Sequence, residues 1–389
     1  MCLQAHLGRL RPFFHGGLAI FGCFREILGL IVLFLALAAR PAAAAPIPVL
    51  HLDNSSYVSV VDAAERLGLR MSWVASGGAG GKPGLVLFDA AHRAVLIGES
   101  RETRLDGLRV FLGEPVLVRG GRFYISLLDY AKRLTPLIRP ELCGVPPPRP
   151  RVVAIDPGHG GSDNGMENHR LGLREKVFTL EVALELKPLL EAAGYRVVLT
   201  RTTDTRVELP VRAEIANTQG ADLLVSIHFN ASAPGDARSH GTEVFTFTLP
   251  SQRTDQGWNT RENDREAAPS PVNRFDIWSQ VLAQCVHRQV LDALRTDDRG
   301  QKTMHLGALR GLACPAILVE SAFLSNDAEG SRVATPAFRR QLAEALLAGI
   351  RAYSAELDRL QPAPPPPSRP APGAPNQPPP AAPSHPTRP

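Results

Sequence analysis

One stretch of the sequence, VVAIDPGHGG at residues 152–161, constrains the fold more than any other. Its first four residues are apolar and rich in β-branched Val and Ile, which is typical of a buried strand. A loop of Pro and Gly follows at once and places His159 between glycines. Glycine permits unusual backbone angles and a close approach of the backbone to whatever the histidine holds. We therefore expect a strand that delivers a histidine to one edge of a sheet.

Beyond residue 151 the sequence alternates between predicted strands and predicted helices. The expected strands are residues 152–155, 195–199, 222–227, 242–246 and 316–319. The expected helices are residues 175–193, 211–219, 276–294 and 336–357. Pro188 should kink or shorten the first of these helices. Alternation of this kind predicts an α/β fold, in which a mostly parallel twisted sheet is flanked by helices.

The ends of the chain differ in composition from the region between them. Residues 1–45 combine basic residues, a short apolar run and a stretch of alanines, which is typical of a cleaved signal peptide. The apolar run is shorter than the ~20 residues that cross a bilayer, so contact with a membrane is expected only if this leader stays uncleaved. A proline linker at 141–150 precedes the domain expected at 151–358, and a proline-rich tail expected to be disordered occupies 361–389.

Four residues that carry chemistry are expected at the same edge of the sheet. In an open α/β sheet, ligands bind beyond the carboxyl ends of the strands. His159, His228 and Glu320 each follow a predicted strand, and Glu175 begins the helix after the His159 loop. Any one of these residues alone could be an ordinary hydrogen-bonding group. Their joint placement favours a site.

Two histidines and a glutamate are the ligand set of a hydrolytic zinc site. Such a site needs a second carboxylate, which takes a proton from water and returns it to the leaving nitrogen. Glu320 suits that role, because a strand end is rigid and the apolar run before it should raise the pKa of the carboxyl. A cysteine-based zinc site is excluded, because the sequence contains no CxxC pair.

Several phrases in order resemble the zinc-dependent N-acetylmuramoyl-L-alanine amidases of the amidase_3 family. They are IDPGHGG, LREKV, GYRVVLTR, ADLLVSIHFNA and PAILVESAFLSN, all between residues 152 and 353. The resemblance implies Zn²⁺ on His159, Glu175 and His228, with Glu320 as the catalytic carboxylate. It implies hydrolysis of the amide that joins N-acetylmuramic acid to L-alanine in peptidoglycan, for wall remodelling or daughter-cell separation. With the leader, it implies a protein exported to the periplasm or cell envelope.

Two features depart from the family pattern. Phe229 stands where a small residue usually follows the second histidine, and we expect its ring to narrow the cleft. Residues 250–273 form a polar insertion, and in some relatives an extra segment here blocks the site until a partner removes it. Glu262 or Glu266 could cap the metal in that way, with an activator protein relieving the block. The alternative is a plain surface loop.

Residues 48–140 predict a separate small, β-rich α+β domain. The phrases YVSV at 57–60 and YISL at 124–127, each followed by a predicted helix, suggest an internal duplication. The region resembles the stalk-like domain named after the copper amine oxidase N-terminus, which implies a spacer or a wall-binding module. It has no His, Asp or Glu cluster that would bind copper.

Two other functions remain open from the sequence. One is a zinc peptidase that cuts within the stem peptide, and the other is a non-catalytic wall-binding protein on the same fold. The presence of all four candidate residues argues against the second. Nucleic acid is not an expected partner, because the 43 basic and 38 acidic residues are spread along the chain.

Overall fold

The structure is a computed structural model that describes residues 46–52, 55–74, 81–232, 238–255 and 268–361. The expected signal peptide, the proline-rich tail beyond residue 361, and both Glu262 and Glu266 lie outside the described residues. The described residues from Val49 onward belong to one compact unit. Within them, no helix combines the length and the apolar character that crossing a membrane requires.

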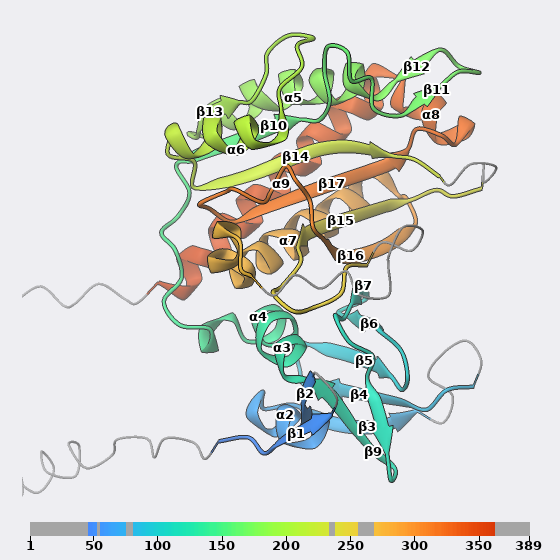
Figure 1. Ribbon diagram of the computed structural model, residues 1–389, viewed down its shortest axis with the longest axis vertical. Helices are drawn as coiled ribbons and strands as arrows, with labels where there is room; N and C mark the ends of the chain where they lie inside the picture. Colours follow the sequence, from blue (N-terminus) through green and yellow to red (C-terminus); the bar gives the residue numbers. More distant parts are fainter. Residues whose placement is uncertain (1–45, 53–54, 75–80, 233–237, 256–267, 362–389) are drawn as a thin grey trace, which may run out of the picture. The chain divides into compact units, whose positions relative to one another are not determined.

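A mixed, largely parallel sheet carries the candidate site (Figure 1). The order of its strands is β13 (Arg196–Leu199), β10 (Val152–Pro157), β14 (Leu223–Asn230), β17 (Ala316–Phe323), β15 (Thr242–Phe247) and β16 (Asp298–Met304). The first four strands run parallel to one another, β15 runs antiparallel to β17, and β16 runs parallel to β15. The prediction of an α/β fold with a mostly parallel sheet is confirmed.

Helices bury both faces of this sheet. Helices α5 (Glu175–Ala192), α7 (Asp276–Leu294) and α9 (Pro336–Leu360) cover one face, and α6 (Leu209–Thr218) packs on the other. Side chains alternate between the two faces of a strand. Ile155 therefore packs in the core beneath α5, α7 and α9, while Ala154 packs in the core on the α6 side. Burial on both sides explains why the predicted strands were continuous apolar runs. A short helix, α8 (Asp327–Val333), follows β17.

The structure differs from the sequence-based expectation in three respects, which involve α5, β14 with β17, and β16. Helix α5 continues past Pro188 to Ala192, so of the two predicted effects of Pro188, a kink or a shortening, the shortening is wrong. Strands β14 and β17 extend beyond their apolar runs, so His228 and Glu320 lie within strands rather than after them. Strand β16 was not predicted, because its sequence DRGQKTM is polar. Partners from elsewhere stabilise it: His287 contacts Asp298, and Glu243 pairs with Lys302.

The N-terminal part is rich in β-strands and includes short helices, as predicted. A four-stranded antiparallel sheet contains β1 (Val49–Leu52), β2 (Ser55–Ser59), β9 (Arg122–Ser126) and β8 (Leu117–Arg119). The two repeated phrases have the same local structure, because Ser59 and Ser126 each end a strand and cap the helix that follows. These helices are α2 (Val60–Arg66) and α3 (Leu127–Asp129), the latter continuing into the π-helical turn η1 (Tyr130–Leu134) and α4 (Thr135–Ile138).

Strands on both sides of the proline linker belong to one sheet. A series of antiparallel strands leads from the small region toward the site: β3 (Arg70–Val74), β4 (Gly84–Phe88), β5 (Arg93–Ile97), β6 (Glu102–Leu105) and β7 (Leu108–Phe111). Strand β7 pairs with β16 through Val110 and Gln301. Buried Arg133 adds to this contact by binding Asp129 at 3.1 Å and Thr303 at 3.0 Å. The domain boundary at 141–150 and the stalk-like character remain predictions.

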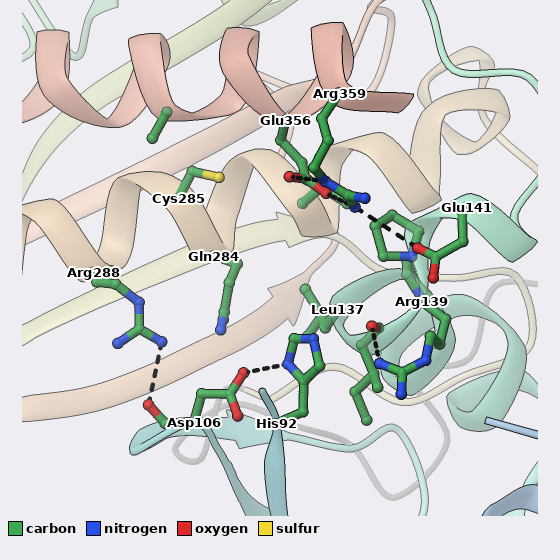
Figure 2. A pocket seen from close by; sticks show the side chains of 15 residues that line it. His92, Asp106, Leu137, Arg139, Glu141, Gln284, Cys285, Arg288, Glu356 and Arg359 are labelled. Atoms are coloured by element: carbon green, nitrogen blue, oxygen red, sulfur yellow. Dashed lines mark hydrogen bonds and ion pairs between the residues drawn. The ribbon is translucent and has the colours of Figure 1, made fainter. Parts of the chain in front are cut away.

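A pocket of about 430 Å³ lies between α4, the β5–β6 region and helices α7 and α9 (Figure 2). The charged groups in it pair with one another: His92 lies 2.8 Å from Asp106, and Arg359 lies 2.6 Å from Glu356. Cys285 lines the same pocket, and burial raises the pKa of its thiol to about 12. These features indicate a contact region between packed elements rather than a reactive site.

Candidate active site and metal centre

The loop after β10 holds His159 in an unusual backbone conformation. The φ angle of His159 is +61°, in the left-handed region that costs a non-glycine residue about 1–2 kcal/mol. Two buried arginines hold the loop through its backbone carbonyls. Arg201 donates to the oxygens of Pro157 at 3.0 Å and Gly158 at 2.9 Å, and Arg212 donates to the oxygen of His159 at 2.9 Å. The tertiary structure therefore fixes the position of the histidine.

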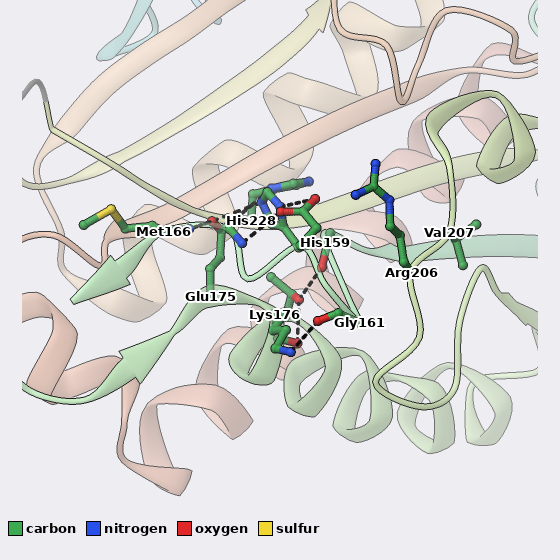
Figure 3. Close-up of polar contacts among 12 residues, drawn as sticks. His159, Gly161, Met166, Glu175, Lys176, Arg206, Val207 and His228 are labelled. Atoms are coloured by element: carbon green, nitrogen blue, oxygen red, sulfur yellow. Dashed lines mark hydrogen bonds and ion pairs between the residues drawn. The ribbon is translucent and has the colours of Figure 1, made fainter. Parts of the chain in front are cut away.

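The Glu175 carboxylate lies at the first residue of α5 and connects the two histidines (Figure 3). Its Oε2 lies 3.1 Å from His159 Nε2 and accepts from the Met166 N–H at 2.8 Å. Its Oε1 lies 2.9 Å from His228 Nδ1 and accepts from the Phe229 N–H at 3.0 Å. Each oxygen thus contacts one ring nitrogen and one backbone donor.

The structure brings the three predicted ligands together. Donor atoms of His159, Glu175 and His228 all lie within 4.8 Å of one another. Burial acts to raise the pKa of Glu175, but the two histidines outweigh it and hold that pKa below its usual value. Burial acts to lower the pKa of His159, but Glu175 and then Asp163 raise it overall. Two imidazoles and one carboxylate that converge in this way can hold a divalent metal ion.

Asp163 is a supporting residue to which the sequence-based reasoning assigned no role. Its Oδ2 lies 3.0 Å from Nδ1 of His159, on the side of the ring away from Glu175. A carboxylate on the second nitrogen of a ligand histidine fixes the tautomer and the ring orientation. The sequence feature that could have indicated this role is an acidic residue four positions after the histidine, in the same glycine-rich loop.

Glu320 lies beside the cluster, directly opposite His228 in the pairing of β14 with β17. Its side chain is half-buried, and its buried Oε2 has no hydrogen-bond partner in the described part of the chain. Burial, followed by the charges of Glu175 and Glu243, raises the pKa of Glu320 well above its usual value. A carboxyl in this state has a high affinity for a proton, which suits general acid–base chemistry.

Glu243 lies next to Glu320 on the neighbouring strand β15. Its carboxylate is buried and forms ion pairs with Lys302 and, at 3.3 Å, with Arg299. Asn230 also donates to it. The Glu243 carboxylate is therefore a paired, buried group beside Glu320 rather than a second unpaired acid in the site.

The expectation that Phe229 narrows the cleft is wrong. Phe229 is 1% exposed and packs edge-to-face on Phe178, with the ring centroids 6.5 Å apart. Neighbouring residues on a strand point to opposite faces, so His228 faces the site while the Phe229 ring enters the core. Asp156 is also buried, and it holds the loop by accepting hydrogen bonds from Thr200 and Arg212.

Comparisons with known proteins identify the region that contains these residues. The family model described as N-acetylmuramoyl-L-alanine amidase (Amidase_3) matches residues 153–352. The chain is 33% identical over 219 residues to the amidase AmiC of Neisseria meningitidis serogroup B, covering 52% of each protein. It is 34% identical over 200 residues to the sporulation-specific amidase of Bacillus subtilis, covering 51% of this chain and 66% of that protein.

Among solved structures, the N-acetylmuramoyl-L-alanine amidase of Clostridium difficile 630 matches 53% of this chain and 97% of its own. The identity is 32% and the TM-score is 0.44. The chain spans only 35% of a cell wall amidase of Bacillus anthracis, described as uncharacterized, and 52% of a probable amidase AmiB of Haemophilus influenzae. The similarity therefore concerns one domain of these longer proteins.

The close approach of the His228 ring requires a glycine at position 158. A Cβ there would lie 2.2 Å from the Cε1 atom of His228, and the φ angle of Gly158 is one that alanine can adopt. We expect Gly158→Ala to displace the ring and to weaken the affinity of the His159, Glu175 and His228 cluster for a divalent metal ion by roughly 10–100-fold, as loss of supporting contacts does at metal sites. Competition with a coloured chelator measures this. Gly311→Ala, which meets a single methyl group at 3.2 Å, is the control. Equal affinities would contradict the prediction.

Proposed function

The chain belongs to the N-acetylmuramoyl-L-alanine amidase family, and on this premise we propose that it is a zinc-dependent hydrolase of peptidoglycan. The bond cut is the amide between N-acetylmuramic acid and L-alanine. The observation that carries the proposal is the convergence of His159, Glu175 and His228 within 4.8 Å, with Glu320 opposite His228. Zinc in such a site supplies Lewis-acid chemistry, because it polarises a carbonyl and lowers the pKa of water.

The protein's own residues would position the ion and move the proton. His159, Glu175 and His228 would hold the metal, and Asp163 would keep His159 in the tautomer that binds it. Glu320 would accept a proton from the attacking water, because its raised pKa gives the carboxylate a high affinity for a proton. It would then give that proton to the leaving nitrogen of L-alanine. Glu243, the neighbouring carboxylate, is engaged in ion pairs with Lys302 and Arg299.

Analysis of the digestion products tests the reaction. We expect the protein with Zn²⁺ to release intact peptides with N-terminal L-alanine from purified wall, as seen by mass spectrometry. A chelator should stop the release. Glu320→Gln should slow it roughly 10²–10⁴-fold, the usual contribution of a general acid–base group, without loss of bound zinc. Glu344→Gln, on the exposed side of α9, is the control. Cuts within the peptide would indicate a peptidase, and binding without cleavage a wall-binding protein.

The affinity for zinc should depend on pH through His159. The pKa of His159 lies above its ordinary value of about 6.5, and a histidine must lose its proton to bind a metal. The affinity for zinc should therefore be highest at pH values above this raised pKa, and it should decrease as the pH falls through the pKa. Titrations at pH 8, 7 and 6 measure the decrease. Asp163→Asn removes one cause of the raised pKa and should move the decrease to lower pH. An affinity that does not change with pH would contradict this account.

We also propose export to the periplasm or cell envelope, where peptidoglycan lies. The support is the signal-peptide pattern of residues 1–45, which lie outside the described residues. N-terminal sequencing of protein from the envelope fraction should find a start near residue 45. Cytoplasmic protein with an intact leader would contradict the proposal.

An activator that relieves the block by the 250–273 segment remains a prediction, because Glu262 and Glu266 also lie outside the described residues.

A further inference from the structure

The polar residues of the site continue across the sheet beyond Glu320. In register, His228 on β14 lies opposite Glu320 on β17, Glu320 lies opposite Glu243 on β15, and Glu243 lies opposite Gly300 on β16. Residues paired in this way share one face of a sheet, and each strand adds about 4.8 Å. The row therefore extends about 10 Å from Glu320 to β16.

Arg299 lies at the far end of this row, next to Gly300. Its guanidinium carbon lies over the Phe323 ring, 4.7 Å from the ring centre. Its Nε donates to Glu243 at 3.3 Å and its Nη1 to the oxygen of His240 at 3.4 Å. Within the described residues its Nη2 donates to nothing, and the side chain is 34% exposed. Lys302 also pairs with Glu243, so Arg299 is one of two cations on that carboxylate.

The Arg299 side chain opens onto a pocket of about 410 Å³ with a basic lining. Arg109, Arg238 and Arg299 line it together with His240, Asp297 and Asp298. The acidic side chains are engaged, since Asp297 lies 2.9 Å from His240 and Asp298 lies 2.8 Å from His287, and Arg109 is likewise paired with Glu102 at 2.8 Å. Arg299 uses only Nε and Nη1 in its contacts with described residues, so an anion in this pocket would bind at its Nη2 group.

We propose that Arg299 binds a carboxylate of the substrate's peptide, on the leaving-group side of the scissile amide. This inference rests on the proposed function. The carboxylate in question is the free α-carboxylate of the second residue, present when that residue is a glutamate joined onward through its side chain. In an extended peptide it lies about 6 Å from the scissile nitrogen. Arg299 lies on that side of the site, because its guanidinium contacts Glu243, and Glu243 pairs with Glu320 on the neighbouring strand.

The chemistry of the side chain agrees with this role. An arginine presents a planar fork of N–H donors that matches a carboxylate, and a stacked arginine loses little further freedom when it binds. The pairing would select peptides by charge at a position that the metal does not contact. Arg299 would then determine specificity, while the acid–base step stays with Glu320.

Two synthetic substrates test the proposal on the full chain loaded with Zn²⁺. Both are N-acetylmuramoyl-L-alanyl-D-glutamate with the γ-carboxyl blocked as a methylamide, and they differ only in a free α-carboxylate or an α-carboxamide. The wild type should prefer the acid by on the order of tenfold in kcat/KM, as expected for a hydrogen bond to a charged group. Arg299→Met should bring the acid-to-amide ratio close to one, and Arg299→Lys should retain part of it. Arg340→Met, an exposed arginine on α9, should leave the ratio unchanged.

Each other outcome has a distinct meaning. A wild type without preference overturns the inference, whatever the variants do. An equal loss on both substrates in Arg299→Met also overturns it, because the arginine would then act only through Glu243 or through folding. If the zinc-loaded wild type cuts neither these substrates nor purified wall, the proposed function itself fails.

Discussion

The site depends on the burial of one carboxylate, that of Glu175. A buried charge is tolerated only when hydrogen bonds and opposite charges surround it, and the loss of one partner of such a pair typically costs about 3–5 kcal/mol. Here two backbone N–H groups and two imidazoles provide those contacts. Glu175 begins α5, and its partners lie in the segment after β10 and on β14. The contacts of this one charge therefore align three segments that are separate in sequence. A divalent ion would meet the same need with its own charge.

The rigidity of the His159 loop follows from how its carbonyl groups are bound. Beyond the end of a strand, backbone carbonyl oxygens have no hydrogen-bond partner on a neighbouring strand. When such oxygens are buried, they require N–H or O–H donors from elsewhere in the protein. Arg201 and Arg212 supply them with several N–H groups each, and Asp156 balances the charge of Arg212. The loop can therefore keep His159 at positive φ, with the imidazole held in place before any ligand arrives.

Much of the fold was predictable, because the parallel strands are buried on both faces and so appear as apolar runs. The convergence of His159, His228 and Glu320 followed from the rule that ligands bind at the carboxyl ends of such strands. Strand β16 was not predictable, since its polar residues depend on partners elsewhere in the chain, such as His287. The direction of Phe229 was open to prediction from alternation alone, because two neighbouring strand residues cannot both face the site.

The reversal of β15 explains why the site extends past the metal-binding cluster. In a fully parallel sheet, the carboxyl end of every strand would lie on this edge. Because β15 runs antiparallel to β17, its beginning lies beside Glu320 instead. The same edge therefore receives the first residues of β15 and of β16, which contribute Glu243 and Arg299. The two histidines of the cluster come from the ends of parallel strands and Glu175 from the start of α5, whereas Glu243 and Arg299 come from strand starts, so one edge carries both the candidate site and the arginine that we propose recognises charge.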